Sequence, residues 1–277
     1  MDLSVIGKKS EPKVFEYDWK EAILYALGIG AQTDELDFLY ENAPGGFKVF
    51  PSFGTLVLAR HWDILDPLET EQIRTIHSSH SLRLYRPLPP RGKLRTVAQI
   101  SNIYDKGRAA IIIILIEART EAGEPVFDNE AVLFYIGGGA FGGDRGPKPE
   151  VLRPREGVDP DFRVAYSIPE NQAALARLSG DFNPLHIDPE LAKAVGFDKP
   201  ILHGLCTFGY ATRAIVHSVC DGDVSRFKEF RTRFSAPVYP GETLNVEGWK
   251  DEGGRFIMQA RTERGKVLTN GCAVVEE

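Results

Sequence analysis

The stretch ARTEAGEPVF, residues 118–127, returns near the end of the chain as ARTERGKVLT, residues 260–269. Each copy leads into a segment in which apolar and polar residues alternate, NEAVLFY after the first copy and NGCAVVE after the second. Alternation with a period of two, broken by turns that contain Gly, is the pattern of antiparallel hairpins. A hairpin that occurs twice in 277 residues predicts a chain built from two similar halves.

A second pair of matched segments extends the repeat upstream. RPLPPRGKLRTV, residues 86–97, matches APVYPGETLNVE, residues 236–247. The spacing between the matched segments is eight residues longer in the first half, which is therefore expected to carry an insertion between matched strands. Each half is predicted to be a helix-containing front followed by a curled antiparallel sheet, an α+β arrangement.

The join between the halves is rich in Gly and Pro. GGGAFGGDRGPKPEVLRPREG, residues 137–157, has no apolar periodicity, as expected of a linker. It contains Gly137-x-Gly139-x-x-Gly142, which matches a dinucleotide-binding fingerprint in form only, because no helix start follows the glycines. The predicted organisation is a first half at residues 1–140, a linker at 141–160 and a second half at 161–277.

Composition limits the possible partners and location. The formal charge of −6 and the lack of a long basic run argue against nucleic acid as a partner. No apolar run approaches the roughly 20 residues of a membrane span, and the N-terminus lacks a signal-peptide core, so a soluble intracellular protein is expected. The C-terminal Val275-Glu276-Glu277 is not a peroxisomal address, which favours the cytoplasm. The three cysteines are too few for a disulfide framework and are expected to be reduced.

The segment SGDFNPLHIDPELAKAVGFD, residues 179–198, gathers a carboxylate, an amide and an imidazole. Helix formers precede it and stop at a glycine, while Asp188-Pro189-Glu190 is the start signal of a second, short helix. Asp181, Asn183 and His186 are therefore predicted to lie on a tight connection between two capped helices. Such a connection can hold side chains rigidly enough to converge on one point, although Asp and Asn are also common turn residues.

A longer helix is predicted downstream, in PILHGLCTFGYATRAIVHSV, residues 200–219. Its apolar residues recur on one face over about fifteen positions, which suits the central helix that a curled sheet would wrap. Gly204 lies in its first turn. The backbone N–H groups of a first turn have no partner within the helix, and a glycine lets a ligand oxygen approach them closely.

Metal binding is one alternative for this region. His186-x-Asp188 and His77-x-x-His80 both have ligand-like spacing, but Asp188 is already explained as a helix cap and neither pair has a third ligand spaced to join it. No metal is therefore expected. The remaining histidines, His61, His203 and His217, are expected to be structural.

A nucleophilic mechanism is another alternative. Cys206 is predicted at the start of a helix, where a thiol pKa can be lowered, and Ser179 is near His186 in the sequence. Small apolar packing is the more favoured interpretation of Cys206.

Taken together, these residues resemble those of a known family. DFNPLHIDP, residues 181–189, followed by GFDKPILHGLCTF, residues 196–208, is similar to the MaoC-type hydratases, and among them to 2-enoyl-CoA hydratase 2, the hydratase region of peroxisomal multifunctional enzyme type 2. The resemblance covers nearly the whole chain. Further matches are YALGIGA (25–31), FPSFG (50–54), LYRPLP (84–89) and RFSAPVYPG (233–241).

The resemblance implies a double hot dog, in which two hot-dog units of one chain share a continuous sheet. It places the chemistry in the second half and gives the first half a modified central helix that leaves space for a bulky acyl chain. It implies a hydro-lyase that carries out the reversible, (R)-specific hydration of a trans-2-enoyl-CoA to a (3R)-3-hydroxyacyl-CoA. The expected partner is the acyl-CoA substrate, with no further cofactor, and a homodimer is expected.

Hydration of the C2–C3 double bond needs a base for the water that attacks C3, a proton for C2, and a donor that stabilises negative charge on the thioester oxygen. Asp181 and His186 can share one water, and which of them takes its proton is left open. Asn183 is assigned to orienting the water or a catalytic partner. The backbone N–H of Gly204 is assigned to the oxyanion.

By resemblance, His77, Lys106 and Phe234 contact the substrate, with Lys106 facing a CoA phosphate. The segment that usually reads His-Gly-Glu-Gln in the family reads His77-Ser78-Ser79-His80 in this chain. Without a glutamate at position 79, Arg177 is expected to lack its ion-pair partner, and the wall of the acyl pocket is expected to differ.

Two rival functions are compatible with a hot-dog fold. An acyl-CoA thioesterase would release free CoA thiol, whereas a hydratase leaves the thiol masked. A non-catalytic acyl-CoA or acyl-carrier binding protein would be insensitive to Asp181→Asn.

Overall fold

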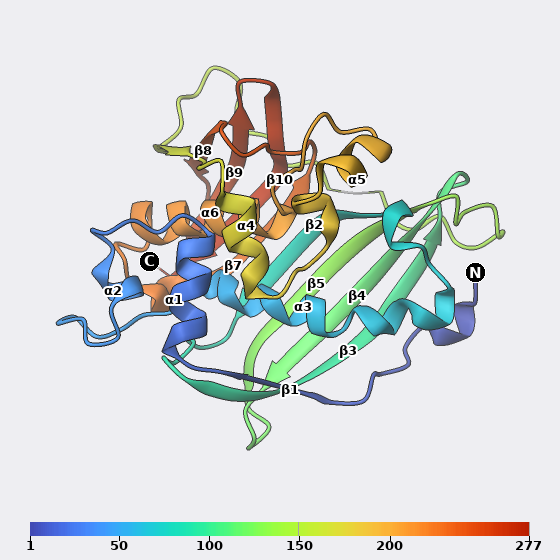
Figure 1. Ribbon diagram of the computed structural model, residues 1–277, viewed down its shortest axis with the longest axis horizontal. Coiled ribbons are helices and arrows are strands. Elements are labelled where there is room, and N and C mark those ends of the chain that lie inside the picture. Colours follow the sequence, from blue (N-terminus) through green and yellow to red (C-terminus); the bar gives the residue numbers. More distant parts are fainter. Residues whose placement is uncertain (149, 277) are drawn as a thin grey trace.

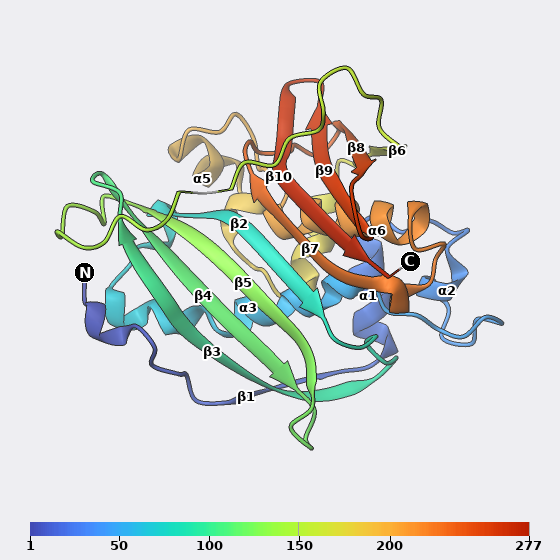
Figure 2. The ribbon, with the colours of Figure 1, turned by 180° about the vertical axis from the view of Figure 1, so that it is seen from behind.

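The alternating segments of both halves form the strands of one antiparallel sheet, in the order β1-β3-β4-β5-β2-β7-β10-β9-β8-β6 (Figures 1 and 2). In the computed structural model, residues 1–148 and 150–276 are described; Pro149, in the expected linker, and Glu277, in the C-terminal Val275-Glu276-Glu277, lie outside these ranges. The strands are β1 (Lys13–Tyr17), β2 (Thr75–Leu84), β3 (Gly92–Asp105), β4 (Ala109–Arg119), β5 (Pro125–Ile136), β6 (Phe162–Ser167), β7 (Phe227–Phe234), β8 (Thr243–Lys250), β9 (Arg255–Thr262) and β10 (Gly265–Val275).

Most of the helices are short. None in the described part of the chain is both long and apolar enough to cross a bilayer. The α-helices are α1 (Trp19–Gly28), α2 (Leu36–Leu39), α3 (Val57–Arg60), α4 (Gln172–Ala176), α5 (Pro189–Ala194) and α6 (Gly204–Ser218). The 3₁₀ helices are η1 (Leu3–Val5), η2 (Pro51–Leu56), η3 (Trp62–Leu68), η4 (Gln72–Arg74), η5 (Arg177–Ser179), η6 (Pro184–His186) and η7 (Val224–Arg226).

The strand order divides into two five-stranded units that meet where β2 pairs with β7. In each unit the strand that precedes the first α-helix, β1 or β6, lies at the outer edge of the sheet. The two copies of the repeated sequence span the β4–β5 turn and the β9–β10 turn, which occupy equivalent places in the two units. The predicted repeat is confirmed, and the architecture is the α+β double hot dog that the resemblance implies.

The connection between the units runs from the end of β5 at Ile136 to the start of β6 at Phe162, and its described residues form no helix or strand. Its glycine-rich start binds a carboxylate of the protein itself. The N–H groups of Ala140 and Gly142 donate to the side chain of Asp105 at 2.9 and 2.8 Å. These donors are therefore occupied, which agrees with the rejection of the dinucleotide fingerprint. The division at residues 141–160 stays a prediction.

The eight extra residues of the first half lengthen a hairpin. β3 has 14 residues and β4 has 11, whereas their counterparts β8 and β9 have 8 each. The ladder between β3 and β4 continues from the Arg95–Arg119 pair to the Asp105–Ala110 pair, so the inserted residues keep backbone hydrogen-bond partners. The expected insertion thus takes the form of longer strands, with the loop reduced to a short turn.

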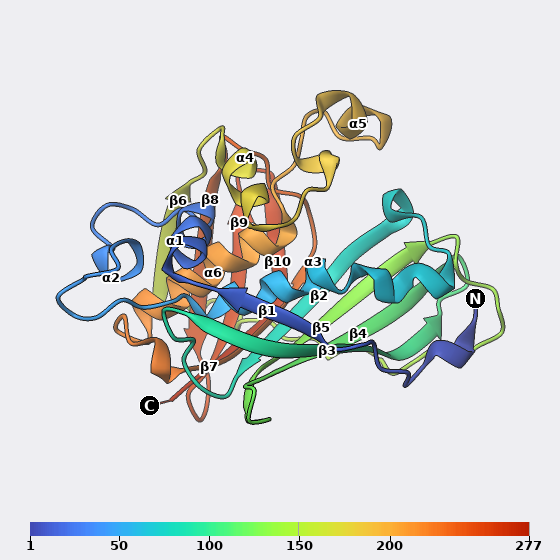
Figure 3. The same ribbon diagram turned by 60° about the horizontal axis from the view of Figure 1, so that its bottom comes forward.

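α6 is the long central helix predicted for the second half, and it lies against the strands of that unit (Figure 3). Phe208 packs on Phe230 of β7 with 4.6 Å between ring centroids, and Ile215 and Val216 are fully buried. Removing a side chain of this size from water stabilises the fold by roughly 1.5–3 kcal/mol. The burial of this face fixes the start of α6, and with it Gly204, relative to the sheet.

In the first half three short pieces, η2, α3 and η3, take the place of a single helix (Figure 3). Pro51 opens η2 and Pro67 lies inside η3. Proline is tolerated at the first position of a helix and Pro67 lies near the end of η3, so neither residue explains the breaks after Leu56 and Arg60. Buried Phe53 and Val57 still anchor the pieces in the core. This agrees with the modified central helix that the resemblance implies.

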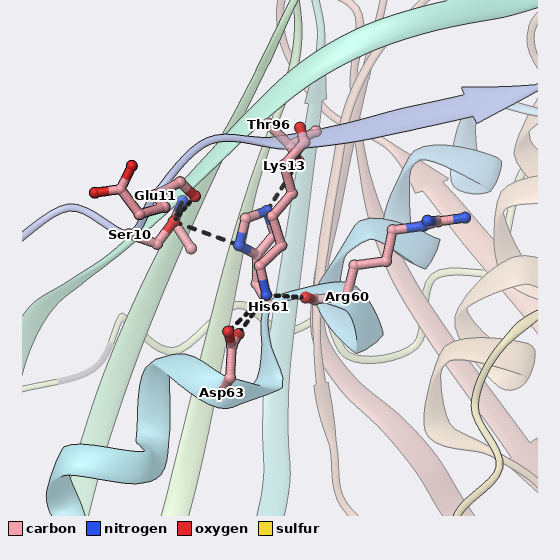
Figure 4. A network of polar contacts seen from close by, with 8 residues as sticks. Ser10, Glu11, Lys13, Arg60, His61, Asp63 and Thr96 are labelled. Atoms are coloured by element: carbon pink, nitrogen blue, oxygen red, sulfur yellow. Dashed lines mark hydrogen bonds and ion pairs between the residues drawn. The ribbon is translucent and has the colours of Figure 1, made fainter.

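A network of polar contacts fastens these pieces to the sheet edge (Figure 4). The buried His61 ring has Nε2 2.8 Å from Thr96 Oγ1 on β3 and Nδ1 3.5 Å from Ser10 Oγ. Burial, and next the charge of Lys13, lower the pKa of His61 to about 4, so the ring is neutral. Lys13 on β1 donates to both Asp63 oxygens at 2.7 Å. His61 therefore has the structural role expected for it.

A buried ion pair ties the loop before α2 to α6. Arg213 Nε and His217 Nε2 donate to Glu35 at 2.8 and 2.6 Å, and the Gln32 N–H donates at 2.7 Å. The Glu35 side chain is 9% exposed and that of Arg213 is 8% exposed. Burial raises the pKa of Glu35, but these hydrogen bonds outweigh it and lower the pKa to about 2. His217 is therefore structural, as expected.

Replacing Glu35 with Gln is expected to lower the free energy of unfolding by about 2–3 kcal/mol at neutral pH, because four hydrogen bonds, two of them from Arg213, lose their charged acceptor. The folded pKa lies below the ordinary 4.5, so this contribution is present above about pH 4.5 and is lost as the pH falls toward 2. Urea unfolding of both proteins at about pH 7 and about pH 3 should show a difference that narrows in acid. The exposed neighbour Asp34 supplies the control: Asp34→Asn should change stability by less than about 0.5 kcal/mol. If the two proteins differed in free energy of unfolding by the same amount at both pH values, the lowered pKa of Glu35 would be contradicted.

Candidate active site

The connection between α4 and α5 carries Asp181, Asn183 and His186. The preceding helix ends at Gly180, whose φ of 123° favours glycine. The Asn183 side-chain oxygen accepts from the Leu185 N–H at 3.1 Å and caps η6, a single 3₁₀ turn within the connection. The Asn183 N–H donates to Asp181 Oδ1 at 3.2 Å. These local bonds fix the backbone from which the three side chains project.

The role assigned to Asn183 stays a prediction, and the capping bond limits which atoms of the side chain can perform it. Because the carbonyl oxygen of the side chain is used by the cap, a water or catalytic partner would be oriented through the amide NH₂. Asp188 accepts from the N–H groups of Glu190 and Leu191 at 2.9 and 3.3 Å. The prediction that Asp188 caps α5 is confirmed.

His186 is held in one tautomer by a backbone carbonyl. Its Nδ1 lies 2.8 Å from the oxygen of Ile201, and a carbonyl oxygen can only accept, so Nδ1 carries the hydrogen and Nε2 carries a free lone pair. Burial lowers the pKa of His186 below its ordinary 6.5, although the charge of Asp181 and the bond to Ile201 oppose this shift. A neutral imidazole with a free nitrogen can accept a proton from water at neutral pH.

His203, which was expected to be structural, also lies in this group. Its ring stacks on that of His186 with 3.7 Å between centroids and 30° between planes. Its Nε2 donates to the backbone oxygen of Asp181 at 3.1 Å, while its buried Nδ1 has no hydrogen-bond partner among the described residues. Burial, and next the neighbouring His186, lower the pKa of His203 to about 4. The signal in the sequence was its position directly before Gly204.

The three side chains converge. One carboxylate oxygen of Asp181 and one ring nitrogen from each of His186 and His203 lie within 4.8 Å of one another. A single water that donates two hydrogen bonds of about 2.8 Å spans roughly 4.5 Å between its acceptors. Asp181 and His186 are therefore spaced to hold one water between them.

Gly204 opens α6 beside this group. The first intrahelical bonds run from the N–H groups of Cys206 and Thr207 to the carbonyl of His203, and the Gly204 N–H has no partner in the described part of the chain. A Cβ built on Gly204 would lie 3.5 Å from the ring of Phe234. A free backbone donor thus lies at the helix start, one residue after His203 and next to an aromatic wall.

The first half reaches the aromatic wall beside Gly204 through β2. The rings of His77 and Phe234, two predicted substrate contacts, meet edge-on with 5.0 Å between centroids. β2 is irregular between His77 and Ser79, and the His80 ring in turn meets Phe208 of α6 edge-on at 5.3 Å. Burial lowers the pKa of His77 to about 3 and that of His80 to about 4, so both rings are neutral. The wall is therefore polar but uncharged.

Arg177 lies beside Phe182, and the effect of a serine at position 79 on its pairing stays a prediction. Its Nε is buried and has no hydrogen-bond partner among the described residues, and its guanidinium lies over the Phe182 ring at 5.3 Å.

Lys106, the third predicted substrate contact, lies apart in the β3–β4 turn. Its ammonium donates to the backbone oxygen of Arg145 and lies 6.0 Å from the Tyr104 ring. Its contact with a CoA phosphate stays a prediction.

The nucleophile alternatives find no support in the geometry. Cys206 Sγ lies 3.1 Å from the backbone oxygen of Gly28, and burial raises the pKa of its thiol strongly. Ser179 Oγ is buried without a hydrogen-bond partner among the described residues, so no base activates it.

A hollow of about 470 Å³ lies on the solvent side of β3 and β4. It contains no imidazole, and its walls are residues 9–12, Arg95, Val97, Glu117 and Arg119. The group around Asp181 and His186 stays the candidate for the chemistry.

Comparison with known proteins identifies both halves. Residues 15–137 match the MFE-2 hydratase 2 N-terminal domain, and residues 152–271 match the MaoC like domain. The chain is 37% identical to a probable enoyl-CoA hydratase 2 of Dictyostelium discoideum, over 98% of this chain and 95% of that protein. It is 39% identical to peroxisomal multifunctional enzyme type 2 of Mus musculus over 98% of its own length, which corresponds to 38% of the mouse protein.

A solved structure with a similar fold is the MaoC-like dehydratase from Phytophthora capsici. It is 31% identical and superposes with a TM-score of 0.89 over 100% of this chain and 98% of that one. Relatives that share more than 30% identity over nearly the whole length establish the family. The chain belongs to the MaoC-like hydratase 2 family of hydro-lyases.

Proposed function

We propose that the protein hydrates trans-2-enoyl-CoA to (3R)-3-hydroxyacyl-CoA and runs the reverse dehydration. The observation that carries this proposal is the convergence, within 4.8 Å, of the Asp181 carboxylate and the His186 imidazole close to the start of α6, where the Gly204 N–H is free. Relatives named as enoyl-CoA hydratase 2 support the substrate class. Family membership supports hydro-lyase chemistry.

In the proposed mechanism the thioester oxygen accepts a hydrogen bond from the Gly204 N–H, a donor of a kind worth roughly 3–4 kcal/mol of barrier. The water held by Asp181 and His186 adds its oxygen to C3 while one of the pair takes its proton. The pair then delivers a proton to C2. Water is added across the double bond, and the two side chains end in the protonation state in which they began.

The reaction needs no redox cofactor, because no electrons are exchanged with a partner, and CoA is part of the substrate. His77 and Phe234 would border the acyl group next to the thioester. Lys106 would face a phosphate of CoA once its bond to the Arg145 carbonyl opens.

Crotonyl-, decenoyl- and ring-bearing enoyl-CoAs test the reaction against its rivals. A hydratase consumes the enoyl absorbance without releasing thiol, and a dehydrogenase specific for (3R)-hydroxyacyl-CoA then oxidises the product. Release of free CoA thiol would instead identify a thioesterase. Ligand binding without either change would identify a non-catalytic acyl-CoA or acyl-carrier binding protein.

The acid side of the pH–rate profile tests the base. Protonated His186 has no lone pair, so kcat/KM should fall as the pH falls through the pKa of His186, and burial places that pKa below the ordinary 6.5. The measurement is kcat/KM for crotonyl-CoA from about pH 5 to pH 8. An acid limb with its midpoint at 6.5 or above would contradict the buried, neutral state of this ring.

A homodimer and a cytoplasmic location complete the proposal. Sedimentation equilibrium of the purified chain should give twice the mass of the monomer. Several relatives carry "peroxisomal" in their names, so imaging of the tagged full-length protein decides between the two compartments.

A further inference from the structure

The helix that leads to Asp181 is tied to a helix of the first unit. α1 ends at Gly28, and the last carbonyl groups of an α-helix lack the usual N–H partners four residues further on. Gln172, the first residue of α4, supplies donors here: its Nε2 donates to the carbonyl oxygens of Leu27 and Gly28 at 3.0 and 2.6 Å. Gln172 is 3% exposed, so water cannot easily replace these two bonds.

The same carbonyl oxygen of Gly28 also accepts from α6. Cys206, in the first turn of α6, has its Sγ 3.1 Å from this oxygen and is 5% exposed. α4 leads through η5 to Asp181, and Cys206 lies two residues after Gly204. One oxygen of the first unit therefore contacts both of the helices that position the proposed chemistry.

α1 approaches α4 and η5 closely at this point. A Cβ built on Gly28 would lie 3.4 Å from the Cα of Ala176 and 3.7 Å from Ser179 Oγ. Ser179 is two residues before Asp181, so the end of α1 packs directly on the turn that leads to the carboxylate. Because closely packed interiors transmit strain, a change in the distance between α1 and α4 moves Asp181 relative to Gly204.

We propose that Gln172 is a positioning residue for hydration, because its two hydrogen bonds to the end of α1 hold the Asp181 carboxylate in place relative to the Gly204 N–H. This role rests on the proposed function. The water held at Asp181 and the thioester bound at Gly204 have to meet in one geometry, and a displacement of about 1 Å can cost about 10²-fold in rate. Gln172 acts through α4 and α1, and it also gives the first unit a part in aligning the reacting groups.

Gln172→Met is the test variant, because methionine has a similar length and suits a buried position but has no N–H to donate. For crotonyl-CoA, kcat should fall about 10-fold or more while KM changes less than about 3-fold, since the predicted substrate contacts His77 and Phe234 lie on β2 and β7. Gln32→Met is the matched control. Gln32 Nε2 donates to the Gly30 carbonyl at 2.9 Å, just after the same helix end, and that bond stays within the first unit. The control should keep the wild-type kcat.

Gly28→Val is a second test, and it leaves the donors of Gln172 in place. The first added carbon fits, but the two methyl groups beyond it would press on α4 and η5. In this variant too, kcat should fall about 10-fold or more at a nearly constant KM. Rates are compared per folded molecule, with the folded fraction taken from urea unfolding. An unchanged kcat in Gln172→Met, or a loss that only matches its unfolded fraction, would overturn the positioning role.

The titration of the His186 imidazole gives a second readout, which needs no turnover. Burial lowers the pKa of His186, and the charge of Asp181 opposes this shift. The stacked ring of His203, with its pKa lowered to about 4, stays neutral through the titration. If Gln172→Met lets Asp181 move away, the pKa of His186 should fall below its wild-type value.

Proton NMR of the imidazole C–H signals measures this pKa, and the signal missing from His186→Gln identifies the ring. A His186 titration that is the same in Gln172→Met and the wild type would overturn the displacement of Asp181. A wild type that does not hydrate crotonyl-CoA would instead refute the proposed function. The NMR titration would then decide by itself whether Gln172 positions the carboxylate.

Discussion

Replacing Asp181 with Asn is expected to lower kcat for crotonyl-CoA hydration by about 10³-fold, because the variant keeps the shape of the side chain and loses its ability to accept and return a proton. Folding should be preserved. Asp181 is partly exposed, and the oxygen of the new amide can still accept the Asn183 N–H that now bonds Oδ1. The free energy of unfolding should therefore change by no more than about 0.5 kcal/mol.

The matched control is Asp188→Asn, seven residues further along the same connection. Asp188 caps α5 through the N–H groups of Glu190 and Leu191, and Asn caps helices about as well as Asp. This variant should hydrate crotonyl-CoA at close to the wild-type rate. Steady-state kinetics and urea unfolding of both variants make the comparison. Full turnover by Asp181→Asn, or equal losses in the two variants, would mean that the carboxylate at 181 takes no part in the chemistry.

Much of the fold was predictable because local sequence patterns indicate its strands and its long helix. The repeated hairpins alternate apolar and polar residues, and the helix now seen as α6 (Gly204–Ser218) has its apolar positions on one face. The breaks between η2, α3 and η3 were less accessible. They depend on how the strands of the first unit leave room for these pieces and on polar contacts such as that of His61 with Thr96, which join residues far apart in the sequence. The longer β3–β4 hairpin shows the same limit. A difference in sequence length does not reveal whether the additional residues form a longer loop or additional paired residues in the two strands.

The residues of the candidate site also differ in how far their positions could be predicted from the sequence. Asp181 and His186 lie five residues apart on one connection, so their proximity followed from turn and cap signals. His203 lies on another segment, and its stacking on His186 arises only when the chain before α6 packs against η6. Asn183 shows the opposite difficulty. Its side-chain oxygen caps η6, a role that the sequence did not separate from the catalytic one left to the amide NH₂.

Replacing Gly204 with Val is expected to lower kcat/KM for crotonyl-CoA by about 10²–10³-fold, the loss that follows removal of one oxyanion donor. The first added carbon fits, since it would lie 3.5 Å from the Phe234 ring, but the two methyl groups beyond it would fill the space beside the free N–H. The backbone at 204 does not have a positive φ, so the variant should fold with little change in its unfolding midpoint.

Gly204→Ala is the graded control for this variant, because it adds only the carbon that fits and leaves the N–H reachable. It should lose less than about 10-fold in kcat/KM. Valine can also act by pressing on Phe234 and shifting α6, so Gly204→Val combined with Phe234→Leu separates the two causes. If the ring contact is the cause, the double variant recovers activity relative to Phe234→Leu alone. If the blocked donor is the cause, the loss persists in the Phe234→Leu background. An activity for Gly204→Val equal to that of the wild type would remove the backbone N–H from the mechanism, since no ligand oxygen could then depend on close approach at this helix start.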